Sequence, residues 1–417
     1  MDWYRYIALL AILSQLVFLF CVYRNHHYAL SKYKRKRTVC RPRAVLIVPC
    51  KGLDSNFQKN ISSLFYQDHE NYLLWFVVAE KSDPAYAELS VLKNQLSQNS
   101  KAQDVQVFVA GPVRDSKESR NNRQKGRISN VAGQGQSCSQ KIHNLLYCYE
   151  RVGDDVEVLA FADSDVCLRS DWLSHIVYPL RQPKNGAASG YRWFIPQKNN
   201  LATLALSAVN AKVAQLLGNS RFNQAWGGSM AIRVETFRRL GLDKIWPKVL
   251  SDDLSLSYAV KKAGLKIAFV PACLVASYES TTWPKLFEFG RRQFLITRVS
   301  APKAWWFGLC SSLYSVLGLW AGATLAVYAA VIGEKNLPLF AAVPIFFFAS
   351  QLVSATLRQA MIAKVLKEDL PKMKAAAVAD IFLSWLWSLL LLSFILSSAF
   401  GRTVCWRGIR YKLTGPH

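Results

Sequence analysis

The sequence predicts an α/β domain with a mostly parallel sheet, flanked by transmembrane helices. Short apolar runs of strand length alternate with segments of helical potential, such as Ile61 to Tyr66 and Ala85 to Leu96. Long apolar stretches stand near both ends of the 417-residue chain. Apolar strands that alternate with helices indicate a parallel sheet covered on both faces. The expected strands are Ala44 to Pro49, Leu73 to Ala79, Val105 to Ala110 and Val156 to Ala162.

The first apolar stretch, Tyr6 to Tyr23, is nearly uncharged and long enough to cross a bilayer core of ~30 Å. No small-residue cleavage signal follows it, so we expect a retained anchor at residues 1–24. Residues 25–43 form a basic juxtamembrane linker without an acidic residue. By the positive-inside rule this flank stays in the cytosol, which places the N-terminus outside and the central domain, residues 44–300, in the cytosol.

Three apolar stretches stand within residues 301–400, at Trp305 to Ile332, Leu337 to Ala355 and Ala375 to Phe400. The connector before the last stretch and the tail, residues 401–417, are both basic, which favours the cytosolic side for both. Four full crossings would leave the tail outside. We therefore expect one stretch to be re-entrant or to lie in the interface.

The net charge of +25 indicates an anionic partner. Much of the basic excess stands beside the apolar stretches, where anionic lipid head groups attract each Lys or Arg by ~1 kcal/mol. The membrane surface is therefore the expected partner, and nucleic acid is not. The nine cysteines are scattered and form no Cys-x-x-Cys pair, so the sequence indicates neither a disulfide framework nor a zinc site.

Polar residues follow the expected strands at the end where parallel sheets bind ligands. Lys51, Glu80 and Asp83 follow the first two strands, and Asp163 and Asp165 follow the fourth. Residues i and i+2 at a strand end project to the same side, so Asp163 and Asp165 can converge on one divalent cation. The same Asp-Ser-Asp sequence also suits a turn or a helix N-cap, and by itself it leaves both interpretations open.

A second acidic pair, Asp252 and Asp253, stands at the start of a short helical pattern that ends near Gly264. Capping and the helix dipole account for one acid at that position. The second acid is harder to explain structurally. Transfer of a sugar to a hydroxyl needs a carboxylate as general base, separate from the carboxylates that hold a metal.

Two further motifs have a structural and a functional interpretation of similar weight. Trp226, Gly227 and Gly228 either bring backbone and an aromatic face to a sugar or form a tight turn around a buried Trp. Arg291 and Arg292 either neutralise a diphosphate or bind lipid head groups.

Two segments outside the expected strands also have two interpretations. The polar, basic segment 114–135 is a loop that closes over a phosphate-bearing ligand or a solvated insertion. Leu201 to Leu217 is an amphipathic helix on the membrane surface or a helix against the core.

These motifs, in their order along the chain, resemble those of ceramide glucosyltransferases and their bacterial relatives among the membrane glycosyltransferases of families 2 and 21. The resemblance runs over nearly the whole chain and includes the N-terminal anchor and the C-terminal membrane helices. The motifs are Asp83-Pro84, Lys141-Ile142-His143-Asn144-Leu145, Asp163-Ser164-Asp165, Gly227-Gly228-Ser229-Met230, Asp252-Asp253, the Arg291-Arg292-Gln293 region and Trp406-Arg407-Gly408-Ile409-Arg410-Tyr411.

The resemblance implies a GT-A fold that transfers glucose, with inversion, from UDP-glucose to the hydroxyl of a membrane lipid such as ceramide. It implies a divalent cation, Mg²⁺ or Mn²⁺, held by Asp165 and Asp163, and a general base at Asp253 with Asp252 beside it. The implied nucleotide-sugar site consists of Asp83, Glu80, Lys51, Lys141, Asp163, Gly227 and Gly228. The implied diphosphate or acceptor site consists of Arg291, Arg292, Gln293, Trp406 and Arg407.

Two departures from the family pattern concern the acceptor and the closing loop. The pattern before the first C-terminal helix is usually Gln or Arg, two residues, then Arg-Trp, whereas this chain has Arg292-Gln293-Phe294 and Arg298 further on. We therefore expect acceptor handling to differ. Segment 114–135 is also longer and more basic than is usual in the family.

Three functions are compatible with the sequence. The first is a lipid glycosyltransferase that acts on a sphingolipid or, alternatively, on diacylglycerol or a hopanoid lipid, in a bacterial inner membrane or a Golgi- or ER-type membrane. The second is a polysaccharide synthase, which the scarcity of charges inside the apolar stretches disfavours. The third is a non-catalytic membrane scaffold whose acidic pairs are helix caps. The sequence does not indicate the oligomeric state.

Overall fold

The computed structural model describes residues 2–34, 40–54, 56–113, 138–406 and 409–413. Its centre is a seven-stranded sheet of strand order β3-β2-β1-β4-β6-β5-β7. Strand β6 runs antiparallel to β4 and β5, and the other pairings are parallel, so the sheet is mostly parallel as expected. The strands are β1 (Ala44–Pro49), β2 (Tyr72–Val78), β3 (Asp104–Val109), β4 (Val158–Ala162), β5 (Asn185–Pro196), β6 (Ser229–Arg233) and β7 (Lys266–Glu279).

The four strands expected from the sequence all form, with bounds within two residues of the expected ones. Strands β5, β6 and β7 were not expected from the sequence. Strand β5 contains Gly186 and Gly190, and its register against β7 shifts near both glycines, so it lacks a continuous apolar pattern. Strand β6 has five residues and begins and ends with a polar residue, Ser229 and Arg233, so its apolar run is only three residues long.

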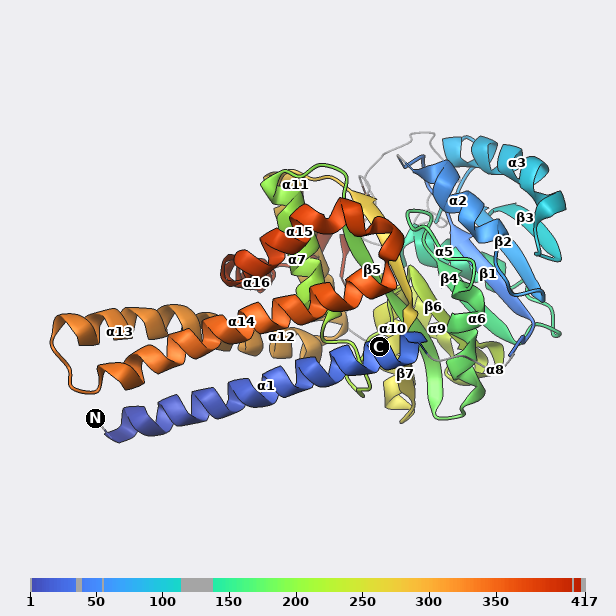
Figure 1. Ribbon diagram of the computed structural model, residues 1–417. Coiled ribbons are helices and arrows are strands. Elements are labelled where there is room, and N and C mark those ends of the chain that lie inside the picture. The colour runs from blue at the N-terminus through green and yellow to red at the C-terminus, as the bar shows by residue number, and fades with distance from the viewer. Residues whose placement is uncertain (1, 35–39, 55, 114–137, 407–408, 414–417) are drawn as a thin grey trace, which may run out of the picture.

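Helices cover both faces of the sheet (Figure 1). In β1, Leu46 and Val48 pack on one face, whereas Val45 and Ile47 pack on the other. Burial on both sides explains why β1 is apolar throughout. The first face packs against α2 (Phe57–Phe65), α3 (Pro84–Leu96) and α6 (Trp172–Val177), and the second against α5 (Gln140–Tyr149), α8 (Val234–Arg239), α9 (Leu242–Ile245) and α10 (Asp252–Lys262). Shorter turns of helix are Ser97–Asn99, Tyr178–Arg181, Trp246–Lys248, Leu317–Ala321 and Lys367–Asp369.

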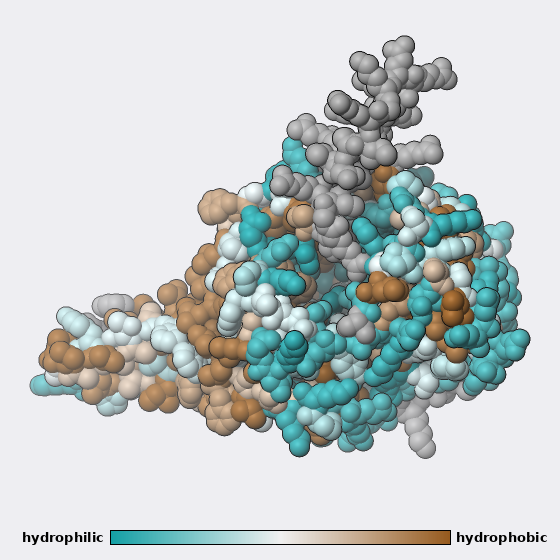
Figure 2. All heavy atoms as spheres, turned by 90° about the horizontal axis from the view of Figure 1, so that it is seen from above, coloured by the Kyte–Doolittle hydropathy of each residue, from teal (hydrophilic) through white to brown (hydrophobic). Residues whose placement is uncertain are grey.

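Three helical segments of the described chain are long and apolar enough to cross a membrane, and they extend together from one side of the sheet domain (Figure 1). Their surface is largely apolar, in contrast to the sheet domain (Figure 2). The first helix continues well into residues 25–43, which were expected to form a linker. The segments are Tyr4–Lys34 within α1 (Asp2–Lys34), Pro302–Val331 with α12 (Pro302–Val316) and α13 (Gly322–Val331), and α14 (Leu337–Val365).

The last apolar stretch is bent rather than straight. It forms α15 (Leu370–Phe382) and α16 (Ser384–Ser397), with an 85° bend at the break between the two helices. This geometry agrees with the expectation that one stretch is re-entrant or interfacial. Three crossings, with the bent pair not counted as a span, would place the tail on the same side as the sheet domain. There the hairpin of β8 (Thr403–Trp406) and β9 (Ile409–Lys412) packs on α11 (Trp283–Ser300) through Val404, Tyr411 and Leu295.

Helix α7 (Leu201–Ala214) is buried against the core rather than spread on a surface. Its residues Ala205 and Leu206 pack with Trp387 and Phe394 of α16, so the second of the two sequence interpretations holds. At the end of α7, Lys212 Nζ lies 3.1 Å from Ser384 Oγ. The helix therefore connects the sheet domain to the bent pair.

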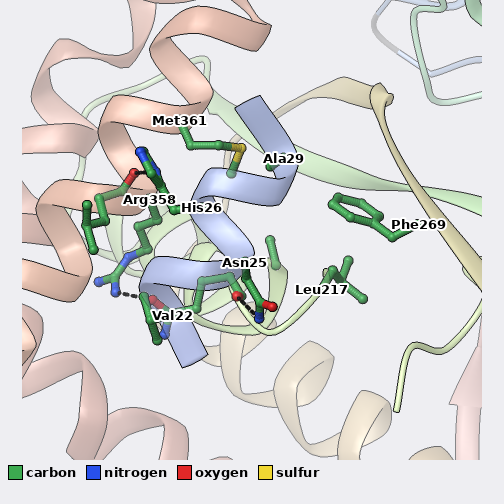
Figure 3. A pocket seen from close by; sticks show the side chains of 11 residues that line it. Val22, Asn25, His26, Ala29, Leu217, Phe269, Arg358 and Met361 are labelled. Carbon is green, nitrogen blue, oxygen red and sulfur yellow. Dashed lines mark hydrogen bonds between the residues drawn. The ribbon is translucent and has the colours of Figure 1, made fainter. Parts of the chain in front are cut away.

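Helix α1 is fixed to the domain and to α14 by polar contacts around a small cavity (Figure 3). Asn25 Nδ2 donates to the carbonyl oxygens of Gln215 at 3.2 Å and Leu216 at 3.1 Å. His26 Nδ1 donates to the carbonyl oxygen of Leu357 at 2.9 Å. These contacts set the position of the N-terminal helix relative to the sheet.

A buried ion pair joins α14 to the bent pair. Arg358 Nε and Nη2 donate to the two carboxylate oxygens of Asp380 at 2.6 and 2.5 Å, and the two side chains are 1% and 0% exposed. Gln359 Nε2 also donates to Asp380, at 2.7 Å. Such bidentate geometry, with further hydrogen bonds, is what a buried charge pair needs to repay its desolvation.

We expect Asp380→Ala to destabilise the protein by ~3–5 kcal/mol, because it leaves the Arg358 charge buried without its partner. The double variant Arg358→Met/Asp380→Leu removes both charges, and we expect it to be closer to the wild type. The apparent melting temperature of the purified protein in detergent measures both effects. A double variant that is less stable than Asp380→Ala would contradict this account.

Candidate active site

The carboxyl edge of the sheet carries a cluster centred on Lys141, in the first turn of α5. Its Nζ lies 2.8 Å from Asp163 Oδ1 and 3.1 Å from Asp252 Oδ2, and the Lys141 side chain is only 16% exposed. Burial lowers the pKa of Lys141, but the charges of Asp163, Asp252 and Asp253 raise it by more, so its pKa lies above the ordinary value. The two acidic motifs, 89 residues apart in the chain, thus share one cation.

Asp163 and Asp165 follow β4 directly and turn to the same side, as expected from their spacing. Their side chains lie 3.8 and 3.9 Å from the two terminal nitrogens of Arg192, which comes from β5. The two carboxylates therefore converge on one cationic group.

Asp252 and Asp253 occupy the first turn of α10, whose N-cap is Ser251. Asp253 accepts from Ser251 Oγ at 2.5 Å, from Leu254 N at 2.7 Å and from Gly227 N at 3.0 Å. Asp252 is buried, and burial raises its pKa to about 6 against the lowering effect of Lys141. Asp253 is the more accessible acid of the pair.

Gly227 and Gly228 leave room for the charged cluster, as a close backbone approach requires. A Cβ on Gly227 would lie 2.6 Å from Asp252 Oδ2 and 2.7 Å from Lys141 Nζ. A Cβ on Gly228 would lie 2.2 Å from the Trp226 ring and 2.8 Å from Asp163 Oδ2. Side chains at these positions would displace the residues of the cluster.

Lys51, Glu80 and Asp83 lie in the loops that follow β1 and β2, at the same edge of the sheet. Asp83 caps α3: its Oδ1 accepts from Ala85 N at 2.9 Å and from Gly52 N at 2.8 Å. Its carboxylate therefore joins the loop after β1 to the loop after β2 and fixes their relative position.

The expected diphosphate or acceptor residues divide into three groups. Arg291 Nε and Nη2 donate to the carbonyl oxygens of Ser397 and Phe400, both at 3.1 Å, so its hydrogen bonds close the end of α16. Arg292 lines a cavity of about 310 Å³ together with Arg291, Glu288 and Cys405. The side chain of Gln293 is exposed on α11. The Trp406 side chain and Arg407 lie outside the described residues. Segment 114–135 also lies outside them.

The sequence matches the family model for glycosyl transferase family 21 over residues 5–122 and 127–416. The chain belongs to glycosyl transferase family 21. This membership and the observed sheet confirm the expected fold class, an α/β domain with a mostly parallel sheet and flanking apolar helices. The family 21 chain is therefore a glycosyltransferase.

Two solved structures share a distant likeness with the chain. One is mannosyltransferase PcManGT from Pyrobaculum calidifontis in complex with GDP-Man and Mn²⁺, with 14% identity over 95% of this chain and 97% of that one, and a TM-score of 0.44. The other is GalNAc-T7 with UDP, GalNAc and Mn²⁺. It has 11% identity over 66% of this chain and 51% of that one, and a TM-score of 0.39. The family membership does not rest on either of these structures. No curated protein matches the chain.

Three neighbours of the acidic residues in this family 21 chain were not expected from the sequence. Arg192 bridges Asp163 and Asp165, and Ser251 donates to Asp253. Glu279, at the end of β7, has its pKa raised by burial and also by the nearby charge of Asp165. The sequence contains one signal that could have indicated Arg192: it is the single charged residue in an otherwise uncharged strand.

The described residues contain no group of three or more His, Cys, Asp or Glu side chains that could hold a metal ion. Mg²⁺ is usually held by one or two carboxylates together with substrate phosphates and water, so a full protein cage is not required. The shared approach of Asp163 and Asp165 to the Arg192 guanidinium shows that both face one cationic position. The two residues therefore fit a cation that arrives with a diphosphate.

We expect Gly228→Ala to lower kcat/KM by about 100-fold, since the added methyl group must push aside Trp226 or Asp163 and a displacement of ~1 Å at a site is that costly. Gly308→Ala is the control, because its nearest atom would be Ile395 Cδ1 at 3.7 Å, an ordinary contact. Steady-state transfer assays on both variants measure the difference. Equal rates in the two variants would contradict the close packing described for Gly228.

We expect kcat/KM to decline as the pH falls through about 6, because protonated Asp252 no longer holds Lys141 by charge. Asp252→Asn is neutral at every pH, so it should be slower and show no inflection near that value. The pH profiles of both proteins between pH 4.5 and 8 measure this. A wild-type profile that is flat through pH 6 would exclude Asp252 from the active state.

Proposed function

We propose that this family 21 glycosyltransferase transfers a hexose, glucose from UDP-glucose, to the hydroxyl of a membrane lipid with inversion, and that ceramide is the acceptor. The observation that supports this most is the position of Lys141, which brings the Asp163 motif and the Asp252-Asp253 pair into one buried cluster. A scaffold whose acids were only helix caps would not need a buried lysine between them. The donor side and the base side of the reaction have separate carboxylates in this cluster.

The donor side would consist of the residues at the sheet edge. Asp83, Glu80 and Lys51 would contact the uridine part, and Lys141, Gly227 and Gly228 would lie near the diphosphate and the sugar. Asp165 and Asp163 would hold Mg²⁺ or Mn²⁺, which neutralises the charge of the departing diphosphate. Among the described residues in this region, Arg292 would supply a further cation for the diphosphate or for the acceptor.

Asp253 would act as the general base. It would take the proton from the lipid hydroxyl while the hydroxyl oxygen attacks the anomeric carbon and the bond from that carbon to the diphosphate oxygen breaks. One such displacement inverts the anomeric centre, and UDP leaves with the electron pair. Ser251 and the Gly227 N–H orient the carboxylate through the hydrogen bonds described above. Asp252 would keep Lys141 in place.

The acceptor would arrive from the bilayer. The three apolar segments extend from one side of the domain, and the cavity lined by Glu288, Arg292 and Cys405 lies between α11 and the tail hairpin. With three crossings and basic flanks, the catalytic domain and the tail would be cytosolic. A lipid could then present its hydroxyl at the membrane surface without leaving the bilayer.

We expect the purified protein in liposomes, supplied with radiolabelled UDP-glucose, Mn²⁺ and ceramide, to label the lipid. Asp253→Asn should lower the rate by ~10²–10⁴-fold, since it removes the base, and should leave UDP affinity largely intact. Asp154→Asn, which alters a distant exposed carboxylate, is the matched control.

The same assay with diacylglycerol or a hopanoid lipid in place of ceramide identifies the acceptor class. Labelling of diacylglycerol or the hopanoid alone would replace ceramide in the proposal. A water-soluble polymer as the product would point to a synthase instead. Unchanged transfer by Asp253→Asn would remove Asp253 from the mechanism.

A further inference from the structure

Arg192 stands where the carboxylates of Asp163 and Asp165 meet. Its Nη2 lies 3.8 Å from Asp163 Oδ2 and its Nη1 lies 3.9 Å from Asp165 Oδ2. Both distances are longer than a direct hydrogen bond, so the guanidinium is shared between the two acids and tightly bound to neither. Its side chain is 18% exposed, which limits screening by solvent.

Aromatic rings hold the guanidinium in this place. Its central carbon lies 4.6 Å from the centre of the Trp226 ring and 5.3 Å from that of Phe194. A guanidinium over aromatic faces is stabilised by cation–π attraction without using its N–H groups. Arg192 therefore keeps donors available for a ligand while its charge faces the acids.

We infer that Arg192 neutralises Asp165, and shares Asp163 with Lys141, in the empty enzyme and turns to the donor diphosphate when the donor binds, so that a divalent cation binds well only together with the nucleotide. This inference rests on the proposed function, because it assigns the two acids to the cation. A guanidinium beside two carboxylates weakens their attraction for a second cation. A diphosphate offers Arg192 bidentate contacts that are stronger than the shared ion pairs.

The consequence is a coupling between two ligands. Cation and nucleotide each bind more tightly when the other is present, and by linkage the factor is the same in both directions. In this scheme Arg192 contacts Asp163 and Asp165 when the site is empty and the donor diphosphate when the donor is bound. This coupling keeps the acids from being occupied by a cation when no donor is present.

The test measures Mn²⁺ affinity by electron paramagnetic resonance, on full-length protein in detergent, with and without UDP. We expect Arg192→Gln to bind Mn²⁺ about tenfold more tightly than the wild type without UDP, and to lose most of the gain that UDP gives the wild type. Arg192→Lys keeps the charge and should stay near the wild type without UDP. Arg238→Gln removes an equal charge on the exposed surface, where Arg238 pairs with Asp154, and should leave Mn²⁺ affinity unchanged.

Two outcomes overturn the inference. The first is wild-type Mn²⁺ affinity of Arg192→Gln in the absence of UDP. The second is an equal gain in Arg238→Gln, which would make the effect one of net charge. Circular dichroism shows whether each variant is folded. The Arg192→Lys protein shows whether a substitution at this position by itself disturbs the site. If the wild type binds Mn²⁺ and UDP together but Arg192→Gln changes nothing, the inference alone fails. If the wild type binds no UDP, the proposed function fails with it.

Discussion

The buried ion-pair cluster of Lys141 with Asp163 and Asp252 is the interaction on which the site depends. A charged lysine in a protected position is costly unless acids compensate it, and acids in such a position need a cation in turn. Each group therefore requires the others. Because Asp163 ends a strand and Asp252 begins a helix, this mutual requirement also fixes α10 against the sheet.

Small residues make this cluster compatible with the backbone. Gly227 and Gly228 precede β6, the antiparallel strand between β4 and β5, and they bring the main chain to within van der Waals distance of the charged groups. The Gly227 N–H uses that proximity to bind Asp253. The turn before the antiparallel strand β6 therefore places a backbone N–H group, that of Gly227, next to the candidate base Asp253.

The membrane part is organised by the same principle of compensated charge. Arg358 and Asp380 pair inside the helical region, close to the 85° bend between α15 and α16, and α7 links this region to β5. A straight fourth crossing would separate the tail from the domain. The bend instead returns the chain so that the tail hairpin packs on α11 beside Arg292.

The sequence by itself determined the first four strands, the α/β class and the apolar helices, because these follow from local periodicity and from apolar runs that only a buried strand or a bilayer accommodates. It also placed Asp163 and Asp165 on one side, since that depends on two-residue spacing alone. Only the tertiary structure decided that Arg192 faces these acids, that Arg291 closes the end of α16 and that α15 and α16 are bent. Each of these facts joins residues many positions apart, and their pairing depends on strand order and on which buried charges compensate one another, not on any local pattern.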